Sequence, residues 1–173
     1  MKQLFVLRHA KSSWDNPGLE DHQRPLAPRG QRACEVMAEH LRSKSIEPEL
    51  VLCSSARRTR ETLEGVAPTG EHVIEPQLYS ASAEDVLERL RRLPDDLSSV
   101  MVIGHNPTMQ VLVLRLARRE GDGVDRSLVE RKFPTGALAT LTFECGWHEL
   151  AAGSARLTEF LTPKGLGATS RAA

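Results

Sequence analysis

The sequence lacks both an imbalance of charge and a long apolar run. Its 23 Lys and Arg residues are matched by 23 Asp and Glu residues, so no overall field would attract nucleic acid or an anionic membrane. No apolar stretch approaches the length that spans a bilayer, and residues 4–7, which precede Arg8, are too few for a signal-peptide core. We therefore expect a cytoplasmic protein that binds neither nucleic acid nor membrane, in which any anion site is a local cluster of side chains.

The sequence also lacks the residue patterns of disulfide, metal and nucleotide sites. Its three cysteines, Cys34, Cys53 and Cys145, are widely separated and form no Cys-x-x-Cys pair, which argues against a disulfide framework and against structural zinc. No glycine-rich phosphate loop is present, and no group of His, Asp and Glu residues has metal-ligand spacing. The expectation is reduced, mostly buried thiols and a site with no metal and no cofactor.

What the sequence does contain is an alternation of strand and helix patterns. Continuous apolar runs at 3–7, 50–53 and 100–103 are typical of parallel strands buried on both faces, and 137–143 predicts a further strand at a sheet edge. Helical spacing of apolar or small residues occurs over 34–41, 59–66 and 83–90, and a fourth helix is expected over 107–118. The pattern predicts a single-domain, three-layer α/β/α sandwich with a mainly parallel central sheet.

Segment boundaries follow from turn and cap signals. Pro28 suits the first turn of a helix, Ser82 with Asp85 resembles a capping box, and Asn106-Pro107 predicts an N-cap followed by the first helical residue. The charged segment 118–133 is expected to be a surface loop. We expect the domain to span 1–164 and to be followed by a disordered tail over 165–173.

Polar residues follow each of the three most apolar strands. They are Arg8-His9, the segment 54–62 with its arginines, and Gly104-His105-Asn106-Pro107. The carboxyl ends of parallel strands share one sheet edge, so two histidines and at least two arginines would converge there. Forked guanidinium donors and a helix start suit a phosphoryl group, and histidine can act on it as nucleophile or as donor. Taken alone, Arg8-His9 is more typical of a solvated loop start. His105 could be a core histidine bonded to backbone, but its place between Gly104 and an Asn-Pro helix start favours a role facing the ligand.

Four blocks of this sequence together resemble the histidine phosphatase (phosphoglycerate mutase-like) superfamily. They are Leu7-Arg8-His9-Ala10, Arg24-Pro25-Leu26 with Gly30, Ser54 to Thr62 with Arg58-Thr59 and Glu61, and Gly104-His105-Asn106-Pro107. The short chain and the start Leu-Arg-His-Ala-Lys-Ser-Ser-Trp are most similar to SixA-type phosphohistidine phosphatases. The resemblance covers residues 3 to about 145.

The resemblance implies a role for each matching residue. His9 would be the nucleophile that becomes phosphorylated, Arg8 and Arg58 would bind the phosphoryl oxygens, and His105 would complete the pocket. Arg57 remains the alternative second arginine. The further expected neighbours of the phosphate are Ser12 and Asn106.

The sequence departs from the family pattern at 77–80, where many members carry an acidic proton donor. Ala10 and Glu61 also replace the commoner glycine and glutamine. A general acid typically contributes about 10²- to 10⁴-fold when the leaving group is poor. Phosphohistidine expels imidazole, a better leaving group, so the missing acid favours a phosphorylated protein as substrate, although Asp15, Asp21 or Glu84 could supply an acid from a loop. The alternatives are a phosphomonoesterase on a small phosphorylated molecule and a non-catalytic phosphate-binding or interaction domain.

Overall fold

A mixed sheet forms the centre of the protein. The computed structural model describes residues 1–121 and 123–172. The strands are β1 (Lys2–Arg8), β2 (Leu50–Ser54), β3 (Glu71–Glu75), β4 (Ser99–Gly104), β5 (Leu138–Phe143) and β6 (Arg156–Leu161). They form a 6-stranded sheet in the order β3-β2-β4-β1-β5-β6. Strands β1 to β4 are parallel to their neighbours among themselves, whereas β5 runs antiparallel to both β1 and β6.

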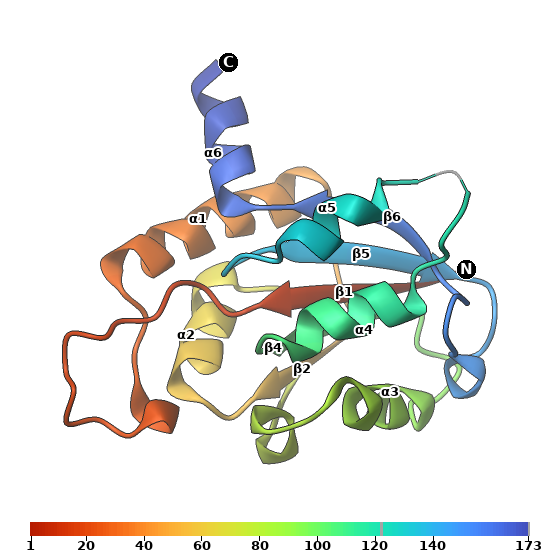
Figure 1. Cartoon of the computed structure of the whole chain (residues 1–173), viewed down its shortest axis with the longest axis horizontal. Coiled ribbons are helices and arrows are strands. Elements are labelled where there is room, and N and C mark those ends of the chain that lie inside the picture. The colour runs from red at the N-terminus through yellow and green to blue at the C-terminus, as the bar shows by residue number, and fades with distance from the viewer. Residues whose placement is uncertain (122, 173) are drawn as a thin grey trace.

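Helices cover both faces of this sheet (Figure 1). They are α1 (Pro28–Ser43), α2 (Arg57–Val66), α3 (Ala83–Arg91), α4 (Thr108–Leu116), α5 (Arg126–Arg131) and α6 (Pro163–Ala172), with single 3-10 turns η1 (Asp21–Gln23), η2 (Pro76–Tyr79) and η3 (Trp147–Glu149). Helices α3, α4 and α5 share one buried cluster with the sheet, and α1 and α2 share the other. The predicted α/β sandwich is therefore confirmed.

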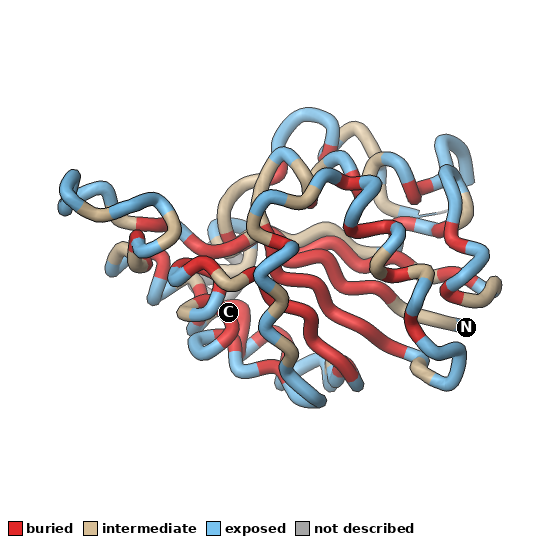
Figure 2. Tube along the Cα trace, turned by 90° about the horizontal axis from the view of Figure 1, so that it is seen from below, coloured by how far each residue is buried: buried red, intermediate tan, exposed pale blue. Residues whose placement is uncertain are grey.

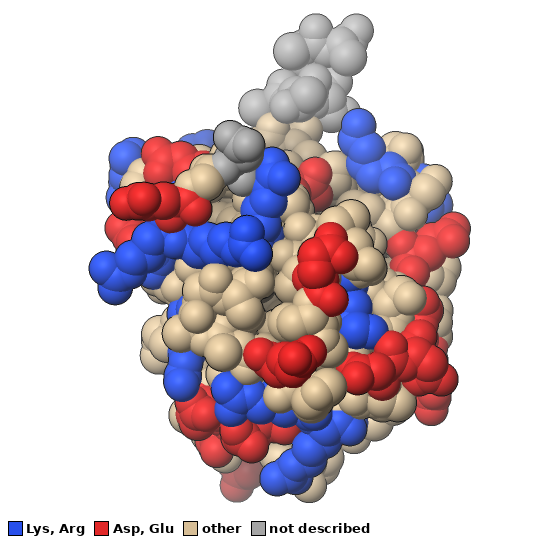
Figure 3. All heavy atoms as spheres, turned by 90° about the vertical axis from the view of Figure 1, so that its right-hand side faces the viewer, with Lys and Arg blue, Asp and Glu red and all other residues tan. Residues whose placement is uncertain are grey.

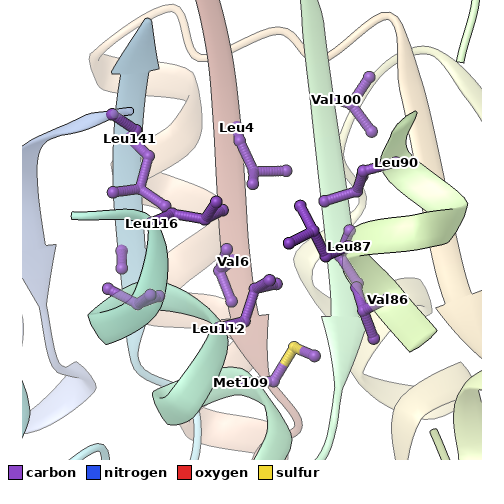
Figure 4. Packing of buried hydrophobic residues seen from close by; sticks show 14 of the residues in the cluster. Leu4, Val6, Val86, Leu87, Leu90, Val100, Met109, Leu112, Leu116 and Leu141 are labelled. Carbon is purple, nitrogen blue, oxygen red and sulfur yellow. The ribbon is translucent and has the colours of Figure 1, made fainter. Parts of the chain in front are cut away.

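The central strands are buried on both faces because successive side chains enter opposite layers. Leu4 and Val6 of β1 point into the cluster under α3 and α4 (Figure 4), while Phe5 and Leu7 join the cluster under α1 and α2. None of these four side chains is more than 2% exposed. The strands therefore run as a buried band through the middle of the molecule (Figure 2), which explains their continuous apolar sequence.

Two of the three expected helix starts are confirmed, and the third is displaced by one residue. Pro28 begins α1, and Ser82 and Asp85 form the reciprocal bonds of a capping box at α3. Helix α4 begins at Thr108 with Pro107, not Asn106, as its N-cap. Asn106 still serves this helix end from one position further out, because its Oδ1 accepts a hydrogen bond from the backbone N–H of Gln110 at 3.2 Å.

The position of β5 in the sheet differs from the expectation. Strand β5 is not an edge strand, because β6 pairs with it and takes the outer position. Strands β3 and β6 carry charged residues and lie at the two edges, so their sequences lack the long apolar run that marks a central strand. On the face in Figure 3, acidic and basic side chains are interspersed, as the balanced composition suggests.

Two segments expected to be irregular contain helix. Residues 126–131 within the predicted surface loop form α5, whose Val129 is fully buried in the core. The predicted disordered tail over 165–173 is replaced through residue 172 by α6, and Ala173 lies outside the described residues. The physical reason for order at the start of α6 is packing, because Leu166 contacts the buried cluster that α1 and α2 share.

Candidate active site

The site lies where β1, β2 and β4 end. Arg8 is the last residue of β1 and pairs in register with Gly104, the last residue of β4. The backbone N–H of His9 donates to the Gly104 carbonyl at 3.0 Å, which ties the two strand ends together. The ring centroids of His9 and His105 are 5.4 Å apart. The predicted convergence at one edge, to which the β1 arrow points in Figure 1, is therefore present.

His9 is held as a neutral imidazole with one nitrogen free. Its Nδ1 lies 2.7 Å from the carbonyl oxygen of Ala10, and because a carbonyl can only accept, Nδ1 carries the proton. The Ala10 N–H in turn donates to Thr62 Oγ1 at 3.0 Å, which fixes this loop against α2. Burial lowers the pKa of His9 to about 3. His9 Nε2 has no hydrogen-bond partner among the described residues, so its lone pair is available for attack.

His105 is neutral too, but both of its nitrogens are engaged. Its Nε2 lies 2.7 Å from Ser54 Oγ, and its Nδ1 lies 3.4 Å from Arg58 Nη2. Because a guanidinium only donates, Nδ1 is the acceptor, and Nε2 carries the proton toward Ser54. Burial, followed by the nearby charge of Arg58, lowers the pKa of His105 to about 4. These contacts position the ring beside His9.

The two expected arginines approach the histidines from different elements. Arg8 donates through Nη1 to the Phe133 carbonyl at 3.0 Å, and its buried Nε has no partner in the described structure. Arg58, in the first turn of α2, is 8% exposed and adjoins His105. Burial lowers the pKa of the Arg8 guanidinium. A buried and a half-buried cationic donor of this kind suit a multiply charged oxyanion.

Arg57, the alternative second arginine, does not join this cluster. Its side chain is 45% exposed and its Nε lies 3.3 Å from Glu61 Oε2, one helical turn along α2. The two side chains project differently because adjacent helix positions face directions about 100° apart. Of the two neighbours, Arg58 is the one beside His105.

Ser12 and Asn106 are near the site but engaged elsewhere. Ser12 Oγ accepts from Arg24 Nη2 at 2.5 Å, and the Ser12 backbone bridges to Leu26. Asn106 Nδ2 donates at 3.0 Å to the Phe133 carbonyl, the oxygen that Arg8 also contacts. Ser12 therefore supports the loop that follows His9, whereas Asn106 adjoins the Arg8 side of the cluster.

A second wall of the pocket was not predicted as a unit. The Asp21 carboxylate accepts hydrogen bonds from Tyr79 Oη at 2.6 Å, from Arg58 Nη2 at 3.0 Å and from Arg24 Nη1 at 3.0 Å. The Tyr79 ring lies edge-on to His105 with centroids 5.6 Å apart. The bond from Tyr79 and those from the two arginines hold the pKa of Asp21 well below its usual range. This carboxylate is therefore ionised.

Some sequence signals for this second wall existed. Asp21 is one of the three candidate acids, and Arg24 belongs to one of the four blocks that resemble the superfamily, without a role implied for it. Tyr79 is the single tyrosine of the chain, but it follows β3, whose polar sequence does not predict a strand ending at the site. The other two candidate acids lie apart from the cluster, because Asp15 is exposed in the preceding loop and Glu84 forms ion pairs with Arg91 and Arg115.

Other site types find little support in residues 1–121 and 123–172. Within those ranges, no three His, Cys, Asp or Glu side chains are grouped so that they could hold a metal ion. Across the same ranges, every helix is too short or too polar to cross a membrane. Cys34 and Cys53 are buried free thiols and Cys145 is a partly buried one, as expected for mostly buried side chains.

The fold and this cluster define a phosphatase that works through histidine. The profile of the histidine phosphatase superfamily (branch 1) matches residues 4–79. An uncharacterized protein of Mycobacterium tuberculosis (strain H37Rv) is 35% identical over 159 residues, which cover 91% of this chain and 100% of that one. The chain belongs to the histidine phosphatase superfamily.

Solved structures agree with this assignment. The SixA-named protein of Nakamurella multipartitia superimposes with a TM-score of 0.84 at 29% identity, covering 94% of this chain and 96% of that chain. A protein histidine phosphatase SixA complexed with tungstate superimposes with a TM-score of 0.76 at 27% identity, covering 95% and 99%. The likeness thus extends over nearly the whole chain.

Proposed function

We propose that this phosphatase hydrolyses phosphohistidine in a protein, through a phosphohistidine intermediate on its own His9. The observation that carries the proposal is the state of Asp21, the carboxylate that the described structure brings into the cluster. Three donors hold it ionised, so it has no proton to give to a leaving group. A site without a protonated acid suits a substrate whose leaving group needs little help.

The reaction has two displacements at phosphorus. The Nε2 lone pair of neutral His9 attacks the phosphorus, and the bond from phosphorus to the substrate imidazole breaks. With its other nitrogen protonated, that ring departs as neutral imidazole. Water then attacks the phosphorus on His9, loses a proton to solvent, and the P–N bond to His9 breaks. Inorganic phosphate and neutral His9 are the products.

The neighbouring side chains have distinct proposed roles. Arg8 and Arg58 bind the equatorial oxygens and stabilise the charge that develops on them. His105 completes the pocket beside His9, 5.4 Å away between ring centroids. We assign Asn106 a place beside the phosphate on the Arg8 side, because Asn106 and Arg8 both donate to the Phe133 carbonyl. Ser12 acts one step further away, by holding Arg24 at the loop after His9.

One solved relative supports an oxyanion as ligand. The SixA structure with tungstate binds a tetrahedral oxyanion, and this chain shares its fold over 95% of its own length. A phosphorylated protein is accordingly the partner that we propose, and the cytoplasm, where free thiols such as Cys34 and Cys53 persist, is the proposed location.

A substrate panel tests the leaving-group argument. The panel contains a histidine-phosphorylated protein, an aryl phosphate, a phosphoserine peptide and a sugar phosphate. We expect kcat/KM for the phosphohistidine protein to exceed that for the two alkyl phosphates by about 10²-fold or more, with the aryl phosphate between them. Equal or faster hydrolysis of an alkyl phosphate would instead identify a small-molecule phosphomonoesterase.

Trapping the intermediate tests the role of His9. Rapid quenching with ³²P-labelled substrate should give a protein-bound label that is stable to base and lost in acid, as a phosphoramidate is. His9→Ala should not take up this label, whereas His148→Ala, which removes an exposed imidazole of η3 that contacts Asp95 and not the histidine cluster, should label normally. Absence of turnover and label with every substrate would leave the phosphate-binding domain as the surviving alternative.

A further inference from the structure

A groove runs beside the active site between α1 and α6, with a volume of about 1160 Å³. Five cations line it, and they come from four separate segments: Lys11, Arg29, Arg32, Lys132 and Lys164. Its apolar lining includes Ala33, Val36 and Leu166. We name this surface, defined by the five cations, the basic groove. Its volume exceeds what one phosphoryl group needs, since pockets for whole drug-sized ligands measure roughly 300–1,000 Å³.

The basic groove is built on the same loops as the phosphate pocket. Lys11 lies two residues after His9, and the backbone of Ala27, just before α1, donates to the Lys11 carbonyl at 2.9 Å. A Cβ at Gly30 would lie 2.1 Å from that same carbonyl oxygen, so glycine permits this close approach of α1. On the opposite wall, Gly136 N–H donates to the His9 carbonyl at 3.0 Å, directly after groove residues Pro134 and Thr135.

The cations of the groove are unpaired, unlike most arginines elsewhere on the protein. None of the five forms an ion pair or a side-chain hydrogen bond with any residue that the structure describes. By contrast, Arg89 and Arg91 of α3 are paired with Glu75 and Glu88. The groove contains two carboxylates, Glu35 and Glu39, and Glu39 lies 2.7 Å from Arg42. A local positive excess therefore exists in a chain of zero net charge.

We propose that the basic groove binds an acidic segment of the phosphorylated protein substrate and thereby selects that substrate for His9. The inference rests on the proposed function, because it concerns what occupies the surface next to the same pocket. Opposite charge attracts and orients an acidic segment, and the apolar lining accommodates its side-chain stems. A peptide suits the groove better than nucleic acid, because the lining has no Phe, Tyr or Trp on which bases could stack.

Paired substrates give a direct test. Two synthetic peptides carry one phosphohistidine each, flanked on both sides by glutamates in one and by serine and asparagine in the other. For the unmodified protein, we expect kcat/KM to be about tenfold higher for the acidic peptide. In R29E/R32E, that preference should disappear or reverse, while hydrolysis of para-nitrophenyl phosphate, which is too small to reach α1, stays unchanged.

A matched variant controls for charge alone. R92E/K44E reverses two exposed, unpaired cations outside the groove, so it changes the net charge by the same amount and should keep the preference. Folding is not at risk in R29E/R32E, because both side chains are exposed, and Arg29 lies in the first turn of α1, where glutamate is favourable. Raising the salt concentration should weaken the preference of the unmodified protein.

Binding measured without turnover separates the two proposals. Fluorescence anisotropy of a labelled poly-glutamate peptide should show binding to the unmodified protein and to R92E/K44E, and little to R29E/R32E. The inference is overturned if the unmodified protein turns over the two phosphohistidine peptides at equal rates, or if its preference for the acidic peptide survives in R29E/R32E. It is also overturned if single-stranded RNA or anionic vesicles bind to the unmodified protein while poly-glutamate does not. Failure of the proposed function differs, because phosphohistidine is then either not hydrolysed or hydrolysed no faster than an alkyl phosphate, while poly-glutamate still binds to the unmodified protein.

Discussion

The active site has two walls that are built in different ways. The strand-end wall, comprising Arg8, His9, Arg58 and His105, is positioned by backbone that leaves β1, β2 and β4 at one sheet edge. The loop wall, comprising Asp21, Arg24 and Tyr79, is held by hydrogen bonds between side chains from η1, η2 and the turn before α1. This difference fits our proposal that the strand-end wall carries the chemistry, and the contact of Asp21 with Arg58 shows how the loop wall can position one arginine of it.

The largest expected effect is the loss of His9. His9→Ala removes the atom that we propose attacks phosphorus, so kcat for any substrate should fall by about 10⁴-fold or more, as it does when a covalent nucleophile is deleted. Initial rates with the phosphohistidine peptide and with an aryl phosphate measure this. A residual rate within tenfold of the unmodified protein would mean that the strand-end wall binds phosphate but does not react with it.

The second effect concerns the neighbouring arginines of α2. Arg58→Ala should lower kcat/KM by about 10²- to 10³-fold, because it removes a buried donor to the developing charge. Arg57→Ala is the matched control, and we expect its rate to change less than twofold, because Arg57 is half-exposed and paired with Glu61. Steady-state kinetics on one substrate decide between them. The reverse order would place Arg57 in the pocket when substrate is bound.

A smaller effect is expected from the loop wall. Asp21→Asn removes the charge that orients Arg58 and Arg24, and kcat should fall by about fivefold, a modest loss because the Asp21 side chain is 50% exposed and screened by solvent. Asp15→Asn, in the same loop but exposed, is the control. A loss in Asp21→Asn as large as that in Arg58→Ala would show that the two walls act as one unit.

The contrast between the walls also explains what the sequence could predict of the fold. Strands β1, β2 and β4 are central, so their apolar runs are unbroken and their ends are easily located. Strands β3 and β6 lie at the sheet edges with one side open to solvent, and α5 has only 6 residues. None of these three elements therefore leaves a strong periodic signal in the sequence. Helix α6 itself contains glycines, which weaken its helical signal in the sequence. Its order depends on packing against α1, which is a tertiary effect.

The same reasoning applies to the site residues. His9 and His105 were predictable because parallel strands deliver their ends to one edge, whatever the intervening sequence. Arg57 and Arg58 point in different directions because they are adjacent on α2. The buried positions Thr59, Thr62 and Leu63 show which of the two faces inward only once it is known which side of α2 packs on the sheet. The path of residues 13–24 has no periodicity, so the meeting of Asp21 with Tyr79, 58 residues away, could not be predicted.

The smallest expected effect concerns the titration of His9 and His105, which we expect to be absent between pH 8 and pH 5. Burial lowers the pKa of His9 to about 3 and that of His105 to about 4, whereas unfolded histidine titrates near about 6.5. In NMR titrations, the ring resonances of both should therefore stay constant from pH 8 to pH 5, while those of a histidine-containing peptide shift. Loss of either constant signal on mutation to Ala assigns it. A midpoint near 6 for His9 would mean that the strand-end wall is more solvated than the structure indicates.

The same two shifts determine a stability difference whose sign can be checked. Below about pH 6.5, unfolded histidines take up protons that the folded site refuses, so the free energy of unfolding falls as the pH drops toward the folded pKa values. Between pH 7 and 5, each buried ring should contribute a loss of roughly 2 kcal/mol at most. Asp21 does not interfere, because its lowered pKa affects stability only below its unfolded value near about 3.9. Urea unfolding at pH 7 and pH 5 measures this loss of unfolding free energy for the unmodified protein and for His9→Ala. If His9→Ala loses as much free energy of unfolding between the two pH values as the unmodified protein, burial of His9 does not make the strand-end wall sensitive to acid.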